Sequence, residues 1–142
     1  MEIQKLATTI SETYKDRTRL EENKAAVLLA LDLLHKGQIR VAERQGPGQW
    51  TVNAWVKEAI LLYFQIAPME KLEAGIFTFY DKIPLRTDYQ QAGVRAVPPA
   101  VSRYGSFIEK GAVLMPSYVN IGAYVASGTM VDTWATVGSC AQ

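Results

Sequence analysis

The C-terminal stretch 107–142 reads, in groups of six, FIEKGA, VLMPSY, VNIGAY, VASGTM, VDTWAT and VGSCAQ. The first position of each group is aliphatic or aromatic, and the fifth position is small. The first column is Phe107, Val113, Val119, Val125, Val131 and Val137, and the fifth column is Gly111, Ser117, Ala123, Thr129, Ala135 and Ala141. An amphipathic helix repeats about every 3.6 residues and a strand about every 2, so neither explains this pattern. A period of six predicts a parallel β-helix, in which three groups make one triangular coil.

In such a coil the first residue of each group points into the prism, and the fifth lies at a cramped corner. Hexapeptide helices coil left-handed, which is an exception to the usual right-handed crossover. The six groups correspond to about two coils. Because repeat proteins need about three or more repeats and a cap, and the pattern continues to Gln142, we expect this chain to be a truncated part of a longer one.

Charge is distributed unevenly along the chain. Glu109, Lys110 and Asp132 are the charged residues of 107–142, and the other 26 of the 29 come earlier. The Pro98-Pro99 pair between the two parts opposes helix and removes strand hydrogen-bond donors. We therefore predict an α+β fold with a mixed α/β N-terminal domain at 1–97, a linker at 98–106, and the first coils of a left-handed parallel β-helix at 107–142.

The N-terminal part contains three helical patterns. Apolar residues at helical spacing predict the first helix over 3–14. The sequence from Thr18 to Glu21 fits a capping box for the second helix, which would end at Gly37. A third helix is expected from Thr51 or Asn53 to just before Pro68. The expected apolar faces are Ile3, Leu6, Ala7, Ile10 and Tyr14 for the first, Val27, Ala30, Leu31 and Leu34 for the second, and Val52, Val56, Ala59, Ile60 and Tyr63 for the third.

Two further stretches complete this part. Alternation around Ile39 and Val41 predicts a strand, followed by a turn at Gly46-Pro47-Gly48. The residues 71–95 show no pattern that assigns an element.

The overall composition excludes several classes of protein. The chain has 142 residues, of which 49% are apolar and 20% charged, with a net charge of +1. This balance indicates a folded protein rather than a disordered one, with no strong nucleic-acid or membrane partner. Cys140 has no second cysteine to pair with, which favours a reducing, cytoplasmic compartment. One histidine and one cysteine make a multi-ligand zinc site hard to build, so we expect no metal.

Specific motifs of the chain resemble a known family. They are VLMPSYVNIGAYV at 113–125 and GTMVDTWATVGSCAQ at 128–142, with RVAE at 40–43, QW at 49–50, DK at 81–82 and RAVPP at 95–99 upstream. Together they resemble the tetrahydrodipicolinate N-succinyltransferases, which are hexapeptide-repeat acyltransferases. The resemblance covers most of the chain, and its most specific block is 113–142.

The resemblance implies an enzyme of lysine and diaminopimelate biosynthesis. Such an enzyme transfers succinyl from succinyl-coenzyme A, its co-substrate, to the amine of tetrahydrodipicolinate, and it binds no permanent cofactor. Family members are homotrimers with active sites between neighbouring β-helices. Further contacts, including a glutamate and most of the coenzyme A contacts, are expected beyond Gln142.

Two family positions fall inside this chain. Arg95 matches the arginine that binds the dicarboxylate substrate, and Asp132 matches the catalytic aspartate that contacts the substrate amine. The residue types suit these roles. An arginine can hold a carboxylate with two hydrogen bonds, and a carboxylate can accept the proton of an attacking amine. Without the resemblance, a surface arginine and a solvated aspartate are the ordinary interpretations.

The other candidate residues have simpler interpretations. His35 is expected to be a cation at a helix end or a surface group, and Cys140 a packed thiol rather than a nucleophile. Tyr118, Tyr124 and Trp134 fit either a ligand groove or a surface that packs against another subunit.

Two alternatives to the enzyme remain open. The chain could be a non-catalytic, trimerising assembly module, since the donor-binding coils are absent from it. Its open coil edges could also pair with another copy of the chain.

Overall fold

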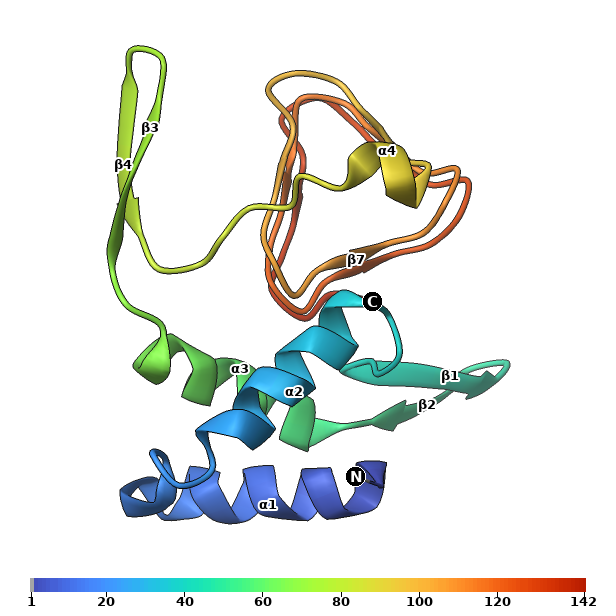
Figure 1. The fold of residues 1–142 in the computed structure, drawn as a ribbon. Coiled ribbons are helices and arrows are strands. Elements are labelled where there is room, and N and C mark those ends of the chain that lie inside the picture. The colour runs from blue at the N-terminus through green and yellow to red at the C-terminus, as the bar shows by residue number, and fades with distance from the viewer. Residues whose placement is uncertain (1) are drawn as a thin grey trace.

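The computed structural model describes residues 2–142. The chain begins with a helical part and a short hairpin, continues through a second, projecting hairpin, and ends in short parallel strands with a triangular outline (Figure 1). The helices are α1 (Ile3–Lys15), α2 (Lys24–His35), α3 (Ala54–Ile66) and α4 (Tyr89–Ala92), with a 3-10 turn, η1, at Arg17–Arg19. The three long helices confirm the helical patterns of the sequence.

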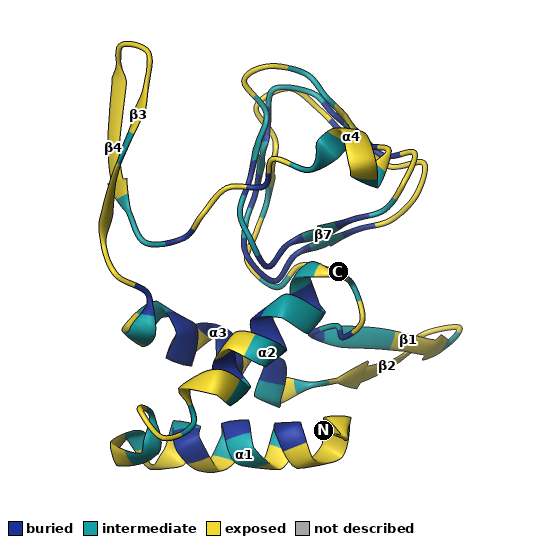
Figure 2. Cartoon of the chain, viewed as in Figure 1, coloured by how far each residue is buried: buried dark blue, intermediate teal, exposed yellow. Residues whose placement is uncertain are grey.

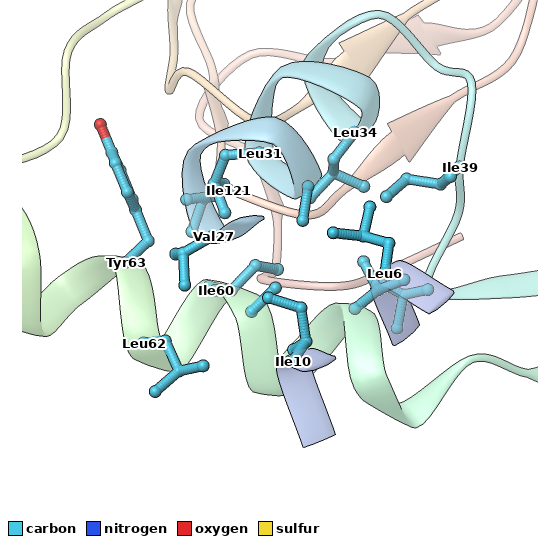
Figure 3. Close-up of a cluster of buried hydrophobic side chains, with 14 of the residues drawn as sticks. Leu6, Ile10, Val27, Leu31, Leu34, Ile39, Ile60, Leu62, Tyr63 and Ile121 are labelled. Atoms are coloured by element: carbon cyan, nitrogen blue, oxygen red, sulfur yellow. The ribbon is translucent and has the colours of Figure 1, made fainter. Parts of the chain in front are cut away.

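The core of the helical part lies where the apolar faces of α1, α2 and α3 meet (Figure 3). Leu6 and Ile10 of α1 pack against Leu31 of α2 and Ile60 of α3 in this cluster. Ile121 joins them from the C-terminal part of the chain and is also fully buried. The helical core therefore extends onto the C-terminal part through Ile121, while the interior of that part forms a cluster of its own.

The start of α2 differs from the prediction. Thr18 lies in η1, where its backbone N–H donates to Asp16 Oδ1 at 3.1 Å, and α2 begins only after Asn23. The capping box was wrong because Asp16, and not Thr18, caps the turn η1, and the Thr18 hydroxyl donates to Asp16 Oδ1 at 2.6 Å. The end of α2 is as expected. Gly37 adopts a left-handed φ of 69°, and the N–H of Gln38 donates to the Leu33 carbonyl at 2.9 Å.

The first hairpin joins β1 (Ala42–Gly46) to β2 (Gln49–Val52) in antiparallel register across the expected turn. The strand prediction was displaced, because Ile39 and Val41 precede β1 and are buried in the helical core. Val52 was also misplaced, since it lies exposed in β2 and not on the buried face of α3.

The stretch that showed no pattern forms a second hairpin, which we call the arm (residues 70–81). It consists of β3 (Glu70–Ala74) and β4 (Phe77–Asp81) in continuous antiparallel register. The arm extends away from the helices and stands beside the C-terminal strands (Figures 1 and 2). Most of its residues are exposed. A connector, residues 82–88, leads from the arm to α4.

Eight two-residue strands form the C-terminal part, which we call the prism (residues 95–142). They are β5 (Arg95–Ala96), β6 (Val101–Ser102), β7 (Phe107–Ile108), β8 (Val113–Leu114), β9 (Tyr118–Val119), β10 (Tyr124–Val125), β11 (Met130–Val131) and β12 (Thr136–Val137). They pair in parallel in the orders β10-β7, β11-β8-β5 and β12-β9-β6. Paired residues are 17 or 18 positions apart, as in Phe107 with Tyr124 and Tyr118 with Thr136.

The parallel strands begin before the first hexapeptide. Arg95 of β5 pairs with Val113, and Val101 of β6 pairs with Tyr118. The segment expected as a linker, 98–106, therefore contains one strand of the prism. Tyr89 of α4 lies at this end, where its hydroxyl is 2.6 Å from Ser102 Oγ. It also packs against the apolar interior.

The interior of the prism is aliphatic, but its phase differs from the prediction in the first two groups. Val119, Val125 and Val131 are buried as expected, whereas Ile108 and Leu114 are buried in place of Phe107 and Val113. The reason is the spacing, because Leu114 and Val119 are both interior residues and lie only five positions apart. The side that ends at Val119 is therefore one residue shorter than a hexapeptide. The expectation of a strict six-residue phase was wrong there.

Two glycines permit the close contact between prism and helices. Gly105 has a φ of 82°, and a Cβ there would lie 2.8 Å from Ile121 Cγ1. Gly122 has a φ of 81°, and a Cβ there would lie 2.7 Å from Ile60 Cδ1. Because any side chain would meet the helical core at these points, the corners at 105 and 122 fix how the prism sits on α2 and α3.

Candidate functional site

Arg95 and Asp132 lie on the same sheet of the prism. Arg95 is in β5, Met130 is in β11, and β8 lies between these strands with Val113 paired to both. Val131 points into the prism, so its neighbour Asp132 points outward, and Arg95 is likewise exposed. Two strand spacings, about 10 Å across the sheet, and two residues, about 7 Å along the strand, separate the two positions. The fold therefore brings these two predicted residues, 37 positions apart in sequence, to one outer face.

The carboxylate of Asp132 is held by its own turn. Oδ1 accepts the backbone N–H of Thr133 at 2.7 Å, and the Asp132 carbonyl accepts the N–H of Ala135 at 3.0 Å. These contacts fix the side chain at the start of the corner and leave the second carboxylate oxygen accessible from solvent.

The guanidinium of Arg95 is available to a ligand. The backbone N–H of Arg95 donates to the Ala112 carbonyl at 3.2 Å, which fixes the strand position. Within residues 2–142, no carboxylate forms a salt bridge with its side chain. An exposed guanidinium on a fixed strand is suited to bind an incoming carboxylate.

A shallow groove of about 270 Å³ lies along the sheet β12-β9-β6, and we call it the Trp134 groove. It is lined by Pro99, Val101, Tyr118 and Trp134 among other uncharged residues. Trp134 adopts a left-handed φ of 59° with 79% of its surface exposed, and its backbone N–H donates to the Pro116 carbonyl at 2.6 Å. A large side chain is rare in this conformation, so the corner holds the indole in an outward position.

A buried arginine that the sequence analysis missed joins the prism to the helices. Arg86 is almost fully buried and donates from its guanidinium to the Ser106 carbonyl at 2.6 Å and to the His35 carbonyl at 3.4 Å. It also binds Asp88 through two hydrogen bonds of 2.7 and 3.0 Å. The hydrogen bonds from Arg86 lower the pKa of Asp88, and the charge of Arg86 adds to this effect. No sequence motif around Arg86 indicated that it would be buried.

His35 belongs to the same junction. Its Nδ1 accepts the backbone N–H of Gly105 at 3.3 Å, and its ring packs on Tyr104 with centroids 4.4 Å apart. Burial lowers the pKa of His35, and the charge of Arg86 lowers it further. The expectation of a helix-end cation is therefore corrected, because the histidine acts as a hydrogen-bond acceptor in a partly buried junction.

The other end of the prism has a second polar cluster. The guanidinium of Arg40 lies 3.5 Å from the centroid of the Tyr124 ring, and its Nε donates to Gln142 Oε1 at 3.1 Å. The Tyr124 hydroxyl donates a short hydrogen bond to Glu109, whose other oxygen accepts the N–H of Ser127 at 2.6 Å. These two hydrogen bonds lower the pKa of Glu109, that of Tyr124 having the larger effect.

Tyr124 and Cys140 both make contacts within the chain. Tyr124 lines a hollow of about 340 Å³ together with Arg40, Trp50 and the interior valines Val131 and Val137. Cys140 is partly buried against the helical core, in the packed position expected for it.

Among residues 2–142, no three histidine, cysteine, aspartate or glutamate side chains cluster closely enough to hold a metal ion. Over the same residues, no helix combines the length and the apolar character that crossing a bilayer would demand.

Comparison with known proteins gives matches along nearly the whole chain. A family model described as tetrahydrodipicolinate N-succinyltransferase N-terminal matches residues 5–66. Proteins named 2,3,4,5-tetrahydropyridine-2,6-dicarboxylate N-succinyltransferase match from Polynucleobacter asymbioticus, Variovorax paradoxus and Nitrobacter hamburgensis, with identities of 53%, 50% and 46%. The matches cover 94%, 98% and 100% of this chain, and 53%, 54% and 55% of the respective relatives. This chain thus spans about half the length of the curated relatives that it matches.

Both comparisons lead to one class of protein, the acyltransferases that bear the name N-succinyltransferase. Within that class, the chain belongs to the tetrahydrodipicolinate N-succinyltransferase family. The resemblance found in the sequence is thereby confirmed.

Proposed function

We propose that this chain forms part of an N-succinyltransferase that transfers succinyl from succinyl-coenzyme A to the amine of tetrahydrodipicolinate. Family membership supports the reaction, because relatives at about 50% identity carry this activity in their names. The observation that carries the proposal is the placement of Arg95 and Asp132 on one outer face of the sheet β11-β8-β5. We assign the complete activity to a protein as long as these relatives, because this chain spans about half of their length.

Arg95 binds a carboxylate of the substrate in this proposal. The relatives' names specify a 2,6-dicarboxylate, and its ring-opened form, which carries the free amine, has one carboxylate at each end. A guanidinium can form two parallel hydrogen bonds with one of them. Two strand spacings across the sheet and two residues along it separate the Arg95 and Asp132 positions by about 12 Å, so the amine end of the ligand extends toward Asp132.

Asp132 acts on the amine. An ammonium has no lone pair, so it must lose a proton before it attacks the thioester, and the accessible oxygen of Asp132 accepts that proton. The amine nitrogen then bonds to the succinyl carbonyl carbon, and the bond from that carbon to sulfur breaks. The nitrogen loses a second proton as the amide forms, and the thiolate of coenzyme A leaves and is protonated.

The remaining assignments follow from the same family. We assign the prism to the start of a left-handed parallel β-helix of about two coils, with a mixed α/β domain before it. The active protein is a homotrimer in the cytoplasm, with Arg95 and Asp132 facing a neighbouring subunit. Succinyl-coenzyme A is a co-substrate rather than a bound cofactor, and no metal takes part.

The proposal is tested by transfer activity in the protein of full length. Thiol release from succinyl-coenzyme A is measured with tetrahydrodipicolinate as acceptor. Asp132→Asn is expected to lower kcat by about 100-fold or more, in the range of general-base catalysis. Arg95→Ala is expected to raise KM by about 10- to 100-fold, as for the loss of a charge-assisted hydrogen bond. Full activity in Asp132→Asn would remove its catalytic role.

Two control variants keep the test specific. Glu22→Gln and Arg44→Ala alter an exposed glutamate and an exposed arginine in the N-terminal part of the chain, and both are expected to leave kcat and KM unchanged. If the wild-type protein associates but releases no thiol, the assembly module replaces the enzyme as the function.

A further inference from the structure

The arm has one apolar face and one polar face. Strand alternation places Leu72, Ala74, Phe77 and Phe79 on one side, where Leu72 pairs with Phe79 and Ala74 with Phe77. The opposite side carries Lys71, Glu73, Thr78 and Tyr80, with a salt bridge of 2.5 Å between Lys71 and Glu73. This pattern is typical of a sheet with one face against protein and the other against water.

The apolar face is uncovered in the single chain. Ile76 at the tip is 94% exposed, Phe77 is 61% exposed and Phe79 is 52% exposed. The rings of Phe77 and Phe79 stack on each other with centroids 6.3 Å apart. Because two strands alone are marginally stable in water, a hairpin with this face gains stability when another surface covers it.

The base of the arm is fixed, which sets the direction of that face. Asp81 accepts a hydrogen bond of 2.8 Å from Arg103, which directly follows β6 of the prism. Lys82 donates to the Phe64 carbonyl of α3 at 2.6 Å. Leu72 of the arm and Leu85 of the connector line one hollow of about 270 Å³. The apolar face therefore continues onto the connector through this hollow, and the arm itself stands beside the prism (Figure 1).

We propose that the apolar face of the arm, formed by Leu72, Ala74, Ile76, Phe77 and Phe79, packs on the prism of a second copy of this chain. The Trp134 groove of that second copy is the surface that receives it. The proposal rests on the homotrimer of the proposed function and adds the contact that would join its subunits.

Size and charge favour a second prism as the partner. Five-residue strands span about 17 Å, and one side of a prism with 17 or 18 residues in each turn spans about 20 Å. The prism carries few charges, three in 107–142. The Trp134 groove is lined by uncharged residues. Packing the tip and middle of the arm there desolvates no charged residue of the groove, whereas a nucleic acid or an anionic membrane would place charged groups against the apolar face.

The area is consistent with a ring of subunits. Each exposed aromatic side chain offers about 150–250 Å² when fully covered, so the tip and face of the arm present roughly 350 Å². This approaches the largest apolar patch of a typical monomer. The arm and the groove are different surfaces, so their contact is heterologous, and it forms a ring where the rotation between copies closes. One such contact covers roughly 700 Å² over both partners, in the range of weak interfaces below about 1,200 Å².

Association of the 142-residue chain, measured by sedimentation over a range of concentrations, tests the proposal. The wild-type chain is expected to associate. The double variant Phe77→Ser, Phe79→Ser is expected to weaken association by about 30-fold or more in dissociation constant. Tyr80→Ser changes an aromatic residue of the same strand that is 71% exposed on the other face, and it is expected to leave association unchanged. Trp134→Ala is expected to weaken association like the arm variant.

Amide hydrogen exchange supplies a second readout that does not depend on variants. Protection of the amides in β3 and β4 is expected to rise with protein concentration in the wild-type chain. A monomeric wild-type chain, protection independent of concentration, or equal effects of Tyr80→Ser and the arm variant would each overturn the proposal. Full association in Trp134→Ala would overturn the assignment of the groove. If the arm variant associates as strongly as the wild-type chain, the arm contact is refuted, but the transferase and its trimer are not. Failure of this proposal is therefore distinguishable from failure of the proposed function.

Discussion

The guanidinium of Arg86 and the carbonyl of Ser106 are 2.6 Å apart in the buried junction between prism and helices. This single contact ties the connector after the arm to the first corner of the prism. Since Arg86 also binds the carbonyl of His35 at the end of α2, one side chain joins three segments that are far apart in sequence. The position of the prism, and with it the face that carries Arg95 and Asp132, depends on this arginine.

Replacement of Arg86 by Met is expected to destabilise the chain by about 2–3 kcal/mol. The substitution leaves two carbonyl oxygens without their donor in a buried site, and each unsatisfied group costs about 1–3 kcal/mol. Urea denaturation measures the change. Arg19→Met removes an exposed salt bridge with Glu12 and should cost less than about 1 kcal/mol. An equal loss in the two variants would contradict the structural role of Arg86.

The stability of the chain is expected to fall as the pH decreases below about 6.5, the pKa of an unperturbed histidine. The pKa of His35 is lowered in the folded state, so the unfolded state binds the proton first and unfolding is favoured as pH falls. The loss begins at the unfolded pKa and is complete below the folded one. The groups that affect this titration are Arg86, Asp88, Asp32 and Lys36.

Thermal unfolding between pH 7.5 and pH 5 measures this effect. His35→Gln is expected to have a smaller dependence on pH in that window, because the amide oxygen can accept the Gly105 N–H without titrating. A wild-type curve that is flat over the window, or a variant curve of the same slope, would refute the assignment.

Substitutions inside the prism distinguish the observed phase from a strict six-residue one. Leu114→Ala is expected to cost about 2–5 kcal/mol, as for a leucine removed from a packed core, because Leu114 is fully buried. Val113→Ala should cost much less, since Val113 lies on the outer side of β8 and is only partly buried. The free energies of unfolding are compared in urea. A larger loss for Val113→Ala than for Leu114→Ala would instead support the strict six-residue phase expected from the repeat.

Gly122→Ala is expected to destabilise the chain more than Gly48→Ala. Both glycines have a left-handed φ near 70–80°, but a Cβ at Gly122 would lie 2.7 Å from Ile60 Cδ1, whereas a Cβ at Gly48 meets no atom within 4 Å. Gly48→Ala therefore measures the cost of the backbone conformation alone, about 1 kcal/mol. The melting temperatures of the two variants provide the comparison. Equal losses would show that crowding at the corner contributes nothing.

Periodic stretches were the part of the fold that the sequence revealed. The three helices and the repeat follow from patterns that extend over ten or more residues, and they were predicted correctly in type. The phase at Leu114 was predicted wrongly. The side between Leu114 and Val119 is one residue short, and this shifts every earlier interior position by one residue. The arm was missed because its alternating pattern, although present, covers only five residues in each strand and has no buried partner in this chain.

The roles of the candidate site residues stay predictions. Motifs indicated Arg95 and Asp132, and the register of β5, β8 and β11 places these two positions on one outer face without testing their roles. Arg86 and His35 could not be found in this way. Their importance depends on burial and on contacts with Ser106 and Gly105, which are 20 and 70 positions away in sequence.

The parallel register gives the length of the chain between Arg95 and Asp132 a meaning of its own. Arg95 and Met130 occupy matching positions on strands two spacings apart, so the number of residues between them sets where Asp132 emerges. Many substitutions in this interval would leave both side chains on the outer face. A single insertion or deletion within one of its strands would turn one of them toward the interior, whereas the corners accommodate turns of 17 and of 18 residues. The place of a length change in this interval therefore matters more than the change itself.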